Sequence, residues 1–175
     1  MHHKKQNYSS GISEKKIGIL LVLTTLAILF GGIVFINNTT ASSQVVASNN
    51  AKVVVESDTF DWGNIPINGG NVTKEFTIKN TGTENLQLTS IKTSCHCTTA
   101  SVTISGNESP SFGMSGTSQW VGEVKPGQEA TLNVVFDPLF HGPQGTGPIN
   151  RYISVETNDK SNSKLTFSLT GVVIK

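Results

Sequence analysis

Two cysteines separated by a single histidine form the most reactive stretch of this sequence, TSCHCTTAS at positions 93–101. Cys95 and Cys97 are the only cysteines in the chain, and His96 lies between them. In an extended strand the Cα atoms of residues i and i+2 are roughly 6.5–7 Å apart, so we expect the two cysteines not to be bonded to each other. Three interpretations then remain: a metal site, a redox-active or intermolecular disulfide, and buried inert thiols.

A metal site at this position requires ligands beyond the two sulfurs. His96, His141 in DPLFHGPQGTG and Met114 in SPSFGMSGTSQW are the candidates, because both loops could fold over the same end of the domain. Thiolate, thioether and imidazole together favour Cu(I), and Zn(II) is the less favoured ion. The simpler alternatives stay open, since Met114 also fits a packing role and His141 also fits an ordinary loop residue.

The elements that would position these residues are strands. Apolar residues alternate with Thr, Ser or Lys, and Val, Ile and Phe are frequent, in segments 52–57, 72–80, 86–92, 130–137, 151–158 and 164–174. Turn-rich clusters such as NTGTEN and TNDKSNS separate them, and no segment of this region has a helical stripe. The pattern predicts an antiparallel all-β sandwich over 52–175.

Five phrases, in order along the chain, resemble one known family. They are FDWGNIPING (60–69), KEFTIKNTGTENLQL (74–88), TSCHCTTA (93–100), VKPGQEATLNVVFDP (124–138) and ISVETND (153–159). Together they look like the bacterial domain-of-unknown-function family 1573, which is related to Hydin-like and major-sperm-protein-like immunoglobulin domains. The resemblance implies an Ig-like sandwich of seven to eight strands and implies little about activity. Many members carry Cys-Gly-Cys at this position, so His96 is a departure from the pattern, and the insertion 105–119 is an elaboration of it.

The N-terminal region has the pattern of a membrane anchor. Residues 17–36 form an uncharged apolar run of the length needed to cross a bilayer as a transmembrane helix. Lysines precede this run and none follows until Lys52, so the positive-inside rule places the tail, 1–16, in the cytoplasm. Residues 37–51 are small and polar, which is typical of a flexible stalk. The alternative is a cleaved signal peptide with a site after Ala41. Both interpretations place the sandwich outside the cytoplasm, at the cell surface or in the periplasm.

The charge pattern and the remaining motifs favour a binding role over catalysis. The formal net charge is +1, without the clustered basic residues of a nucleic-acid-binding surface. GPQGTGP at 142–148 lacks the Lys-Ser/Thr ending of a phosphate-binding loop, and no motif marks a nucleophile. We therefore expect a membrane-anchored, non-enzymatic binding or structural module with a protein or cell-envelope partner. The alternative is a soft-metal-binding protein that uses Cys95, Cys97, His141, Met114 and His96.

Overall fold

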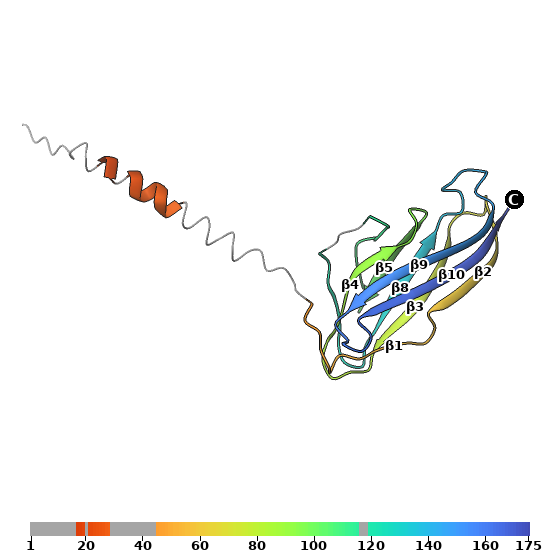
Figure 1. Cartoon of the computed structure of the whole chain (residues 1–175), viewed down its shortest axis with the longest axis horizontal. Helices are drawn as coiled ribbons and strands as arrows, with labels where there is room; N and C mark the ends of the chain where they lie inside the picture. Colours follow the sequence, from red (N-terminus) through yellow and green to blue (C-terminus); the bar gives the residue numbers. More distant parts are fainter. Residues whose placement is uncertain (1–16, 20, 29–44, 116–118) are drawn as a thin grey trace, which may run out of the picture. The chain divides into compact units, whose positions relative to one another are not determined.

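The computed structural model describes residues 17–19, 21–28, 45–115 and 119–175, and the chain divides into two compact units, Met1–Ser42 and Ser43–Lys175. In the first unit the described residues are helical (Figure 1). None of the helical segments placed by the structure has both the length and the apolar character needed to cross a membrane. The expected tail 1–16, the second part of the expected span, 29–36, and residues 37–44 of the expected stalk lie outside the described residues.

The described residues of the second unit form a sandwich of ten strands. Three of them are very short, namely β1 (Val53–Val55), β6 (Asn107–Glu108) and β7 (Gly122–Val124). The longer strands are β2 (Thr59–Pro66), β3 (Val72–Asn80), β4 (Leu86–Thr93), β5 (Thr98–Ile104), β8 (Glu129–Phe136), β9 (Gly147–Thr157) and β10 (Lys164–Ile174). The expected Ig-like sandwich is therefore present, but the expected count of seven to eight strands is too low. Segments of two or three residues are too short to show alternation in a sequence.

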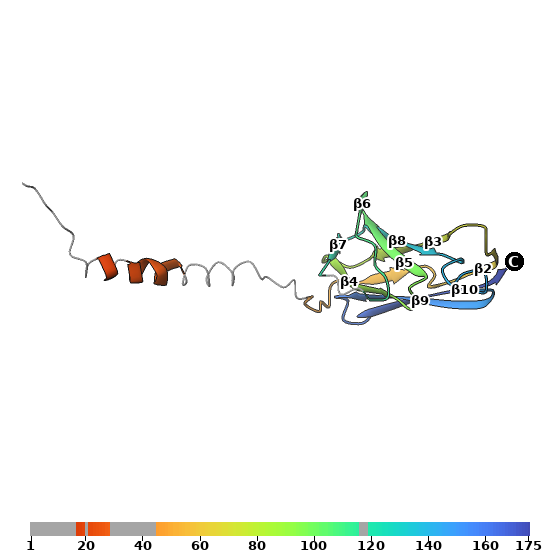
Figure 2. The ribbon, with the colours of Figure 1, turned by 90° about the horizontal axis from the view of Figure 1, so that it is seen from above.

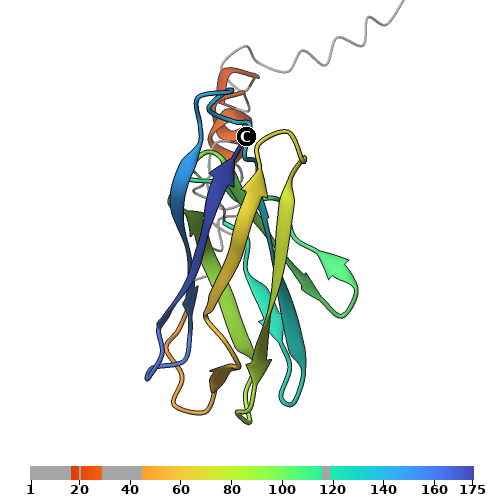
Figure 3. The ribbon, with the colours of Figure 1, turned by 90° about the vertical axis from the view of Figure 1, so that its right-hand side faces the viewer.

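The ten strands form two five-stranded sheets that face each other. One sheet has the order β1-β3-β8-β5-β6 and the other β2-β10-β9-β4-β7. Figure 2 shows β3 and β8 in one layer and β9 and β10 in the other. Every strand pair is antiparallel except β2–β10, which is parallel. Figure 3 shows the long strands side by side, with the segment between β8 and β9 at the same end as the C terminus.

Alternating side chains of the two sheets fill the space between them. Because successive residues of a strand point to opposite faces, every second residue is apolar and buried. The apolar residues that β3, β8, β9 and β10 contribute to the main core cluster are Phe76, Ile78, Ala130, Leu132, Val134, Ile153, Val155, Phe167 and Leu169. The core extends along the sandwich, so its two ends are left for turns and loops, and one of these ends carries the cysteines.

The domain begins before the first strand. The backbone N–H of Ser48 donates to the carbonyl oxygen of Asn158 at 2.7 Å, and Ala51 is fully buried. Residues 48–51, which the sequence pattern placed in the stalk, thus pack against the sandwich.

Candidate functional site

A tight turn between β4 and β5 carries both cysteines. The backbone N–H of Thr98 donates to the carbonyl oxygen of Cys95 at 3.2 Å, which closes the turn. The Thr93 hydroxyl lies 3.0 Å from the carbonyl oxygen of Cys95 and 2.9 Å from that of Thr98. The hydroxyl of this buried threonine therefore stabilises the turn through two of its carbonyl oxygens. The cysteines lie in this turn and not in an extended strand.

Cys95 and Cys97 are joined by a disulfide, and their Cα atoms are 5.2 Å apart. The expectation that they are not bonded to each other is wrong. It assumed the strand spacing of 6.5–7 Å, whereas the turn shortens the distance into the range in which disulfides form. The bond closes a loop that contains only His96 between its ends.

The two sulfur-bearing residues differ in exposure. Cys97 is 3% exposed and packs in a small apolar cluster with Ile65, Phe136 and Val173. Cys95 is only partly buried and packs at the edge of this cluster. A molecule in solution therefore has better access to Cys95 than to Cys97.

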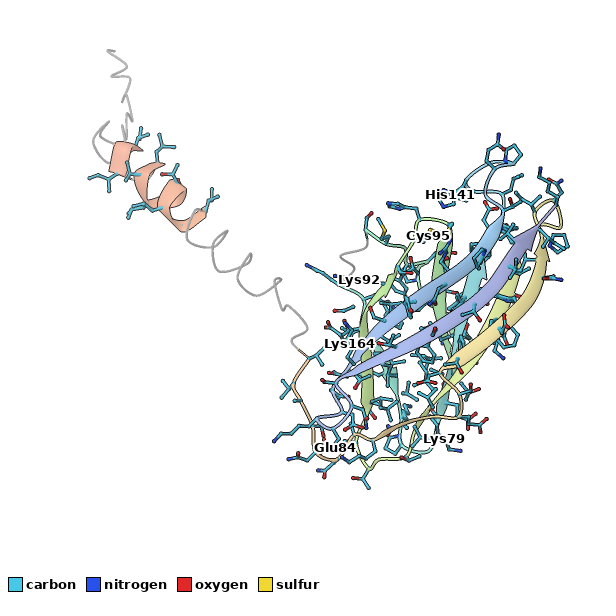
Figure 4. The ribbon with its side chains drawn as sticks, turned by 45° about the vertical axis from the view of Figure 1, so that its right-hand side comes forward. Lys79, Glu84, Lys92, Cys95, His141 and Lys164 are labelled. Carbon is cyan, nitrogen blue, oxygen red and sulfur yellow. A yellow bond between two sulfur atoms is a disulfide. The ribbon has the colours of Figure 1, made fainter. Side chains whose placement is uncertain are left out.

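The segment between β8 and β9 brings His141 to the disulfide. Its first residue, Asp137, donates its backbone N–H to the carbonyl oxygen of Cys97 at 2.9 Å, which places the segment beside the turn. The Nε2 atom of His141 lies 3.8 Å from the Cys95 sulfur. Figure 4 shows His141 and Cys95 at one end of the domain and Glu84 and Lys79 at the other. His141 is exposed, so the site opens to solvent.

The structure brings together three of the five predicted ligands. The two sulfurs and a ring nitrogen of His141 lie within 4.8 Å of one another. His96 is exposed and is not part of this group. Met114 is 44% exposed, and its neighbour Gly113 accepts a backbone hydrogen bond from Thr93 at 3.3 Å. The insertion thus passes close to the turn, and a role for Met114 stays a prediction.

Sequence reasoning missed Arg151, which contacts the disulfide. Its Nε atom donates to the Cys97 sulfur at 3.2 Å, and one terminal nitrogen donates to the carbonyl oxygen of Asn150 at 2.9 Å. The guanidinium also lies 5.4 Å from the ring centre of Phe136. Burial lowers the pKa of Arg151 below its ordinary value. Arg151 is the only arginine of the chain, and that uniqueness is the only sequence signal that could have marked it.

With its disulfide formed, the site lacks the thiolates that would bind a soft metal ion. Metal ions bind thiolates, and a disulfide has none. Two-electron reduction would create two thiolates beside the imidazole of His141, which is a soft ligand set. The chemistry of the site therefore depends on the redox state of the two cysteines.

Comparisons with known proteins agree with the fold. The model of the HYDIN/CFA65/VesB-like, Ig-like domain family matches residues 51–171. No curated protein matches the chain. Among solved structures, the chain is similar to a protein of unknown function from Porphyromonas gingivalis W83, with 21% identity, a TM-score of 0.54 and coverage of 74% of this chain and 50% of that one.

Two further structures have lower TM-scores. PapD-like domain 7 of human CEP192 matches at 17% identity and a TM-score of 0.46, over 74% of this chain and 90% of that one. The YadV chaperone matches at 10% identity and a TM-score of 0.41, over 68% and 50%. The chain spans about half the length of the Porphyromonas gingivalis protein, and the 21% identity between the two supports the fold alone.

Proposed function

We propose a function from the premise that this chain belongs to the HYDIN/CFA65/VesB-like Ig-like domain family. In this proposal the chain is a single-pass membrane protein, and its Ig-like domain lies outside the cytoplasmic membrane. The domain acts as a non-enzymatic binding or structural module. The observation that carries the binding-module part of this proposal is the two-sheet sandwich, which the family model matches. Within the family, the five phrases quoted above favour domain-of-unknown-function family 1573.

The membrane anchor rests on the N-terminal sequence. Residues 17–36 have no charge, lysines lie only on their N-terminal side, and the described residues of this stretch are helical. Mass spectrometry of the N terminus of the membrane-extracted protein tests the anchor. A chain that retains 17–36 supports it, and a chain that begins near Ser42 contradicts it.

The outer edge of β2 is the surface best suited to a partner. β2 is an edge strand of eight residues, whereas the opposite edge of the same sheet, β7, has three. An unpaired edge offers backbone N–H and C=O groups to an incoming segment. Phe60 on β2 is exposed and adds an apolar contact. Gly63, with a φ of +66°, lies where the β2–β10 ladder shifts register, and this irregularity limits indiscriminate pairing.

Site-specific photocrosslinking in intact cells tests this surface. A photoreactive residue at position 60 should capture one reproducible partner. The same residue at position 172 is the matched control, because Val172 is exposed but lies on β10, which is paired on both of its edges. Equal capture at both positions, or none at position 60, would contradict binding through β2.

A second candidate function, soft-metal binding, is favoured by the group formed by Cys95, Cys97 and His141. Reduction of the disulfide would supply the two thiolates, and Cu(I) fits this set better than Zn(II). The role of the protein would then be to hold, deliver or sense the ion.

Competition titration of the reduced full-length protein tests metal binding. With Cu(I) and a chelator of known affinity, the wild type should bind more tightly than the Cys95→Ser/Cys97→Ser variant. His141→Ala should weaken binding, whereas His96→Ala, at an exposed residue outside the group, should not. Met114→Ala decides whether the thioether is a ligand. Equal affinity of the wild type and the double serine variant would rule out the metal site.

A further inference from the structure

The contacts of the disulfide are asymmetric in two respects. The Cys95 sulfur is at the accessible side of the turn, next to the exposed His141, whereas the Cys97 sulfur is buried and accepts a hydrogen bond from the Arg151 guanidinium. We propose that this disulfide is redox-active, that a dithiol attacks it at Cys95, and that Cys97 leaves as a thiolate stabilised by Arg151. The proposal does not depend on metal binding.

Arg151 has a positive charge that the oxidised site does not neutralise. In the described part of the chain, ion pairs form between Lys52 and Asp159 and between Lys79 and Glu129, and no carboxylate pairs with Arg151. A disulfide sulfur is neutral and is a weak acceptor. A thiolate at the same position would make a charge-assisted hydrogen bond with the guanidinium. Arg151 therefore stabilises the reduced form more than the oxidised form.

The disulfide is poorly suited to stabilising the fold. A cross-link stabilises mainly by restricting the unfolded chain, and the effect grows with the length of the closed loop. Here the cross-linked residues are separated by two positions, which is close to the shortest possible loop. A bond that contributes little to stability can be opened and closed without unfolding the domain.

The exchange balances without a further reactant. One thiolate of the donor attacks the Cys95 sulfur, the Cys95–Cys97 bond breaks, and Cys97 leaves with the electron pair. The second donor thiolate then attacks the mixed disulfide, forms the disulfide of the donor and releases Cys95. Two electrons pass from the donor to the protein. The two donor thiols each release one proton, and these two positive charges equal the two negative charges of the new cysteine thiolates.

The equilibrium constant for reduction tests the role of Arg151. Full-length protein is equilibrated in buffers of reduced and oxidised dithiothreitol with a metal chelator, and the free thiols are counted by mass after alkylation. In Arg151→Gln the equilibrium constant for reduction should fall roughly tenfold, because a charge-assisted hydrogen bond to Cys97 is lost. This factor corresponds to about 30 mV for a two-electron couple. Arg151→Lys keeps the charge and should recover part of the loss.

Lys92→Gln is the matched control, because it removes one positive charge from an exposed position on the adjacent strand β4. It should change the equilibrium constant less than twofold. An Arg151→Gln value within twofold of the wild type, or equal to that of Lys92→Gln, would overturn the proposal.

The site of attack is tested separately. In Cys97→Ser the remaining thiol at Cys95 should react with a bulky disulfide reagent at least tenfold faster than Cys97 does in Cys95→Ser. Tryptophan fluorescence verifies that both variants fold. Mass mapping of the mixed disulfide that glutathione forms with the wild type needs no substitution. Glutathione on Cys97 instead of Cys95 would refute attack at the exposed sulfur.

Small molecules and proteins supply the same dithiol chemistry. Reduced thioredoxin and dithiothreitol are therefore compared as donors at equal thiol concentration. A faster reaction with thioredoxin supports a protein dithiol as the donor, and a faster reaction with dithiothreitol supports a small thiol. Failure of both to reduce the disulfide under native conditions would overturn the proposal and would leave the binding-module function untouched.

Discussion

Replacing Asp159 with alanine removes a buried carboxylate that joins the start of the domain to the turn between β9 and β10. This side chain is 0% exposed. It accepts hydrogen bonds from the backbone N–H groups of Val53 at 3.0 Å and Ser161 at 2.9 Å and from the Asn162 amide at 3.2 Å. The Lys52 ammonium lies 3.6 Å away. Asp159 thus connects β1 to a turn that is more than 100 positions later in the sequence.

The expected loss follows from these contacts. Hydrogen bonds to a charged group contribute roughly 1.5–3 kcal/mol, and the buried N–H of Val53 would be left without an acceptor. We expect Asp159→Ala to lower the free energy of unfolding by roughly 3 kcal/mol, which is about 10 °C in Tm for a domain of this size. Asp159→Asn keeps one oxygen and should cost about half as much.

The same carboxylate predicts a pH dependence. Burial raises the pKa of Asp159, but hydrogen bonds from Val53, Ser161 and Asn162 and the charge of Lys52 lower it to about 2, from an ordinary value of 3.8. The unfolded chain therefore takes up the proton at higher pH than the folded domain. The contribution of Asp159, on the order of 2 kcal/mol, is fully present above about pH 5 and is lost as the pH falls from about 4 to about 2.

Urea unfolding followed by tryptophan fluorescence measures both effects, because Trp62 and Trp120 are the only tryptophans and both lie in the sandwich. Between pH 5 and pH 2 the free energy of unfolding should fall less steeply for Asp159→Asn than for the wild type. Glu84→Gln is the control: hydrogen bonds from Ser48 and Asn50 lower the pKa of Glu84, but its exposure reduces the effect. Equal slopes for Asp159→Asn and the wild type would refute the assignment of the pH dependence to Asp159.

Three further changes test the core, a close backbone approach and the disulfide, each by the same urea assay. Phe167→Ala empties a fully buried position and should cost about 3–5 kcal/mol; a loss below 1 kcal/mol would contradict tight packing there. Gly82→Ala would place a Cβ against the backbone that leads into β1 and should cost roughly 1–3 kcal/mol, whereas Gly113→Ala meets nothing within 4 Å and should be neutral. The Cys95→Ser/Cys97→Ser variant should lose at most about 1.5 kcal/mol, because the loop is so short; a loss above 3 kcal/mol would indicate a structural cross-link.

The strands that alternation predicts are those with one buried face. The expected segments 72–80, 86–92 and 130–137 coincide with β3, β4 and β8 to within one residue at each end. β2 was missed because it is an edge strand with nearly all its residues exposed. β5 was missed because three successive residues, Ala100, Ser101 and Val102, are buried, which interrupts the alternation.

The site was predictable in its residue types and not in its bonds. The thiol and imidazole side chains lie in separate loops of the sequence, and their types indicated that Cys95, Cys97 and His141 could form one site. The structure places these three side chains together. The disulfide was missed because it depends on the backbone of a four-residue turn, in which the Thr93 hydroxyl takes part. The contact between Arg151 and Cys97 joins residues 54 positions apart, and it follows from how β9 lies against the turn, which no local pattern encodes.

Metal binding and reduction of the disulfide are linked, because the same two sulfurs serve both. A metal ion that binds only the dithiol form pulls the redox equilibrium toward reduction by the factor 1 + [metal]/Kd. Free Cu(I) at ten times its Kd should therefore raise the apparent equilibrium constant for reduction roughly tenfold in the wild type. His141→Ala should reduce this effect of Cu(I), because His141 is a ligand candidate. The equilibrium constant of this variant in the presence of a chelator is the reference for the comparison, since the imidazole also lies 3.8 Å from the Cys95 sulfur. An equilibrium constant that does not respond to Cu(I) would separate the two proposals and leave redox exchange as the chemistry of this site.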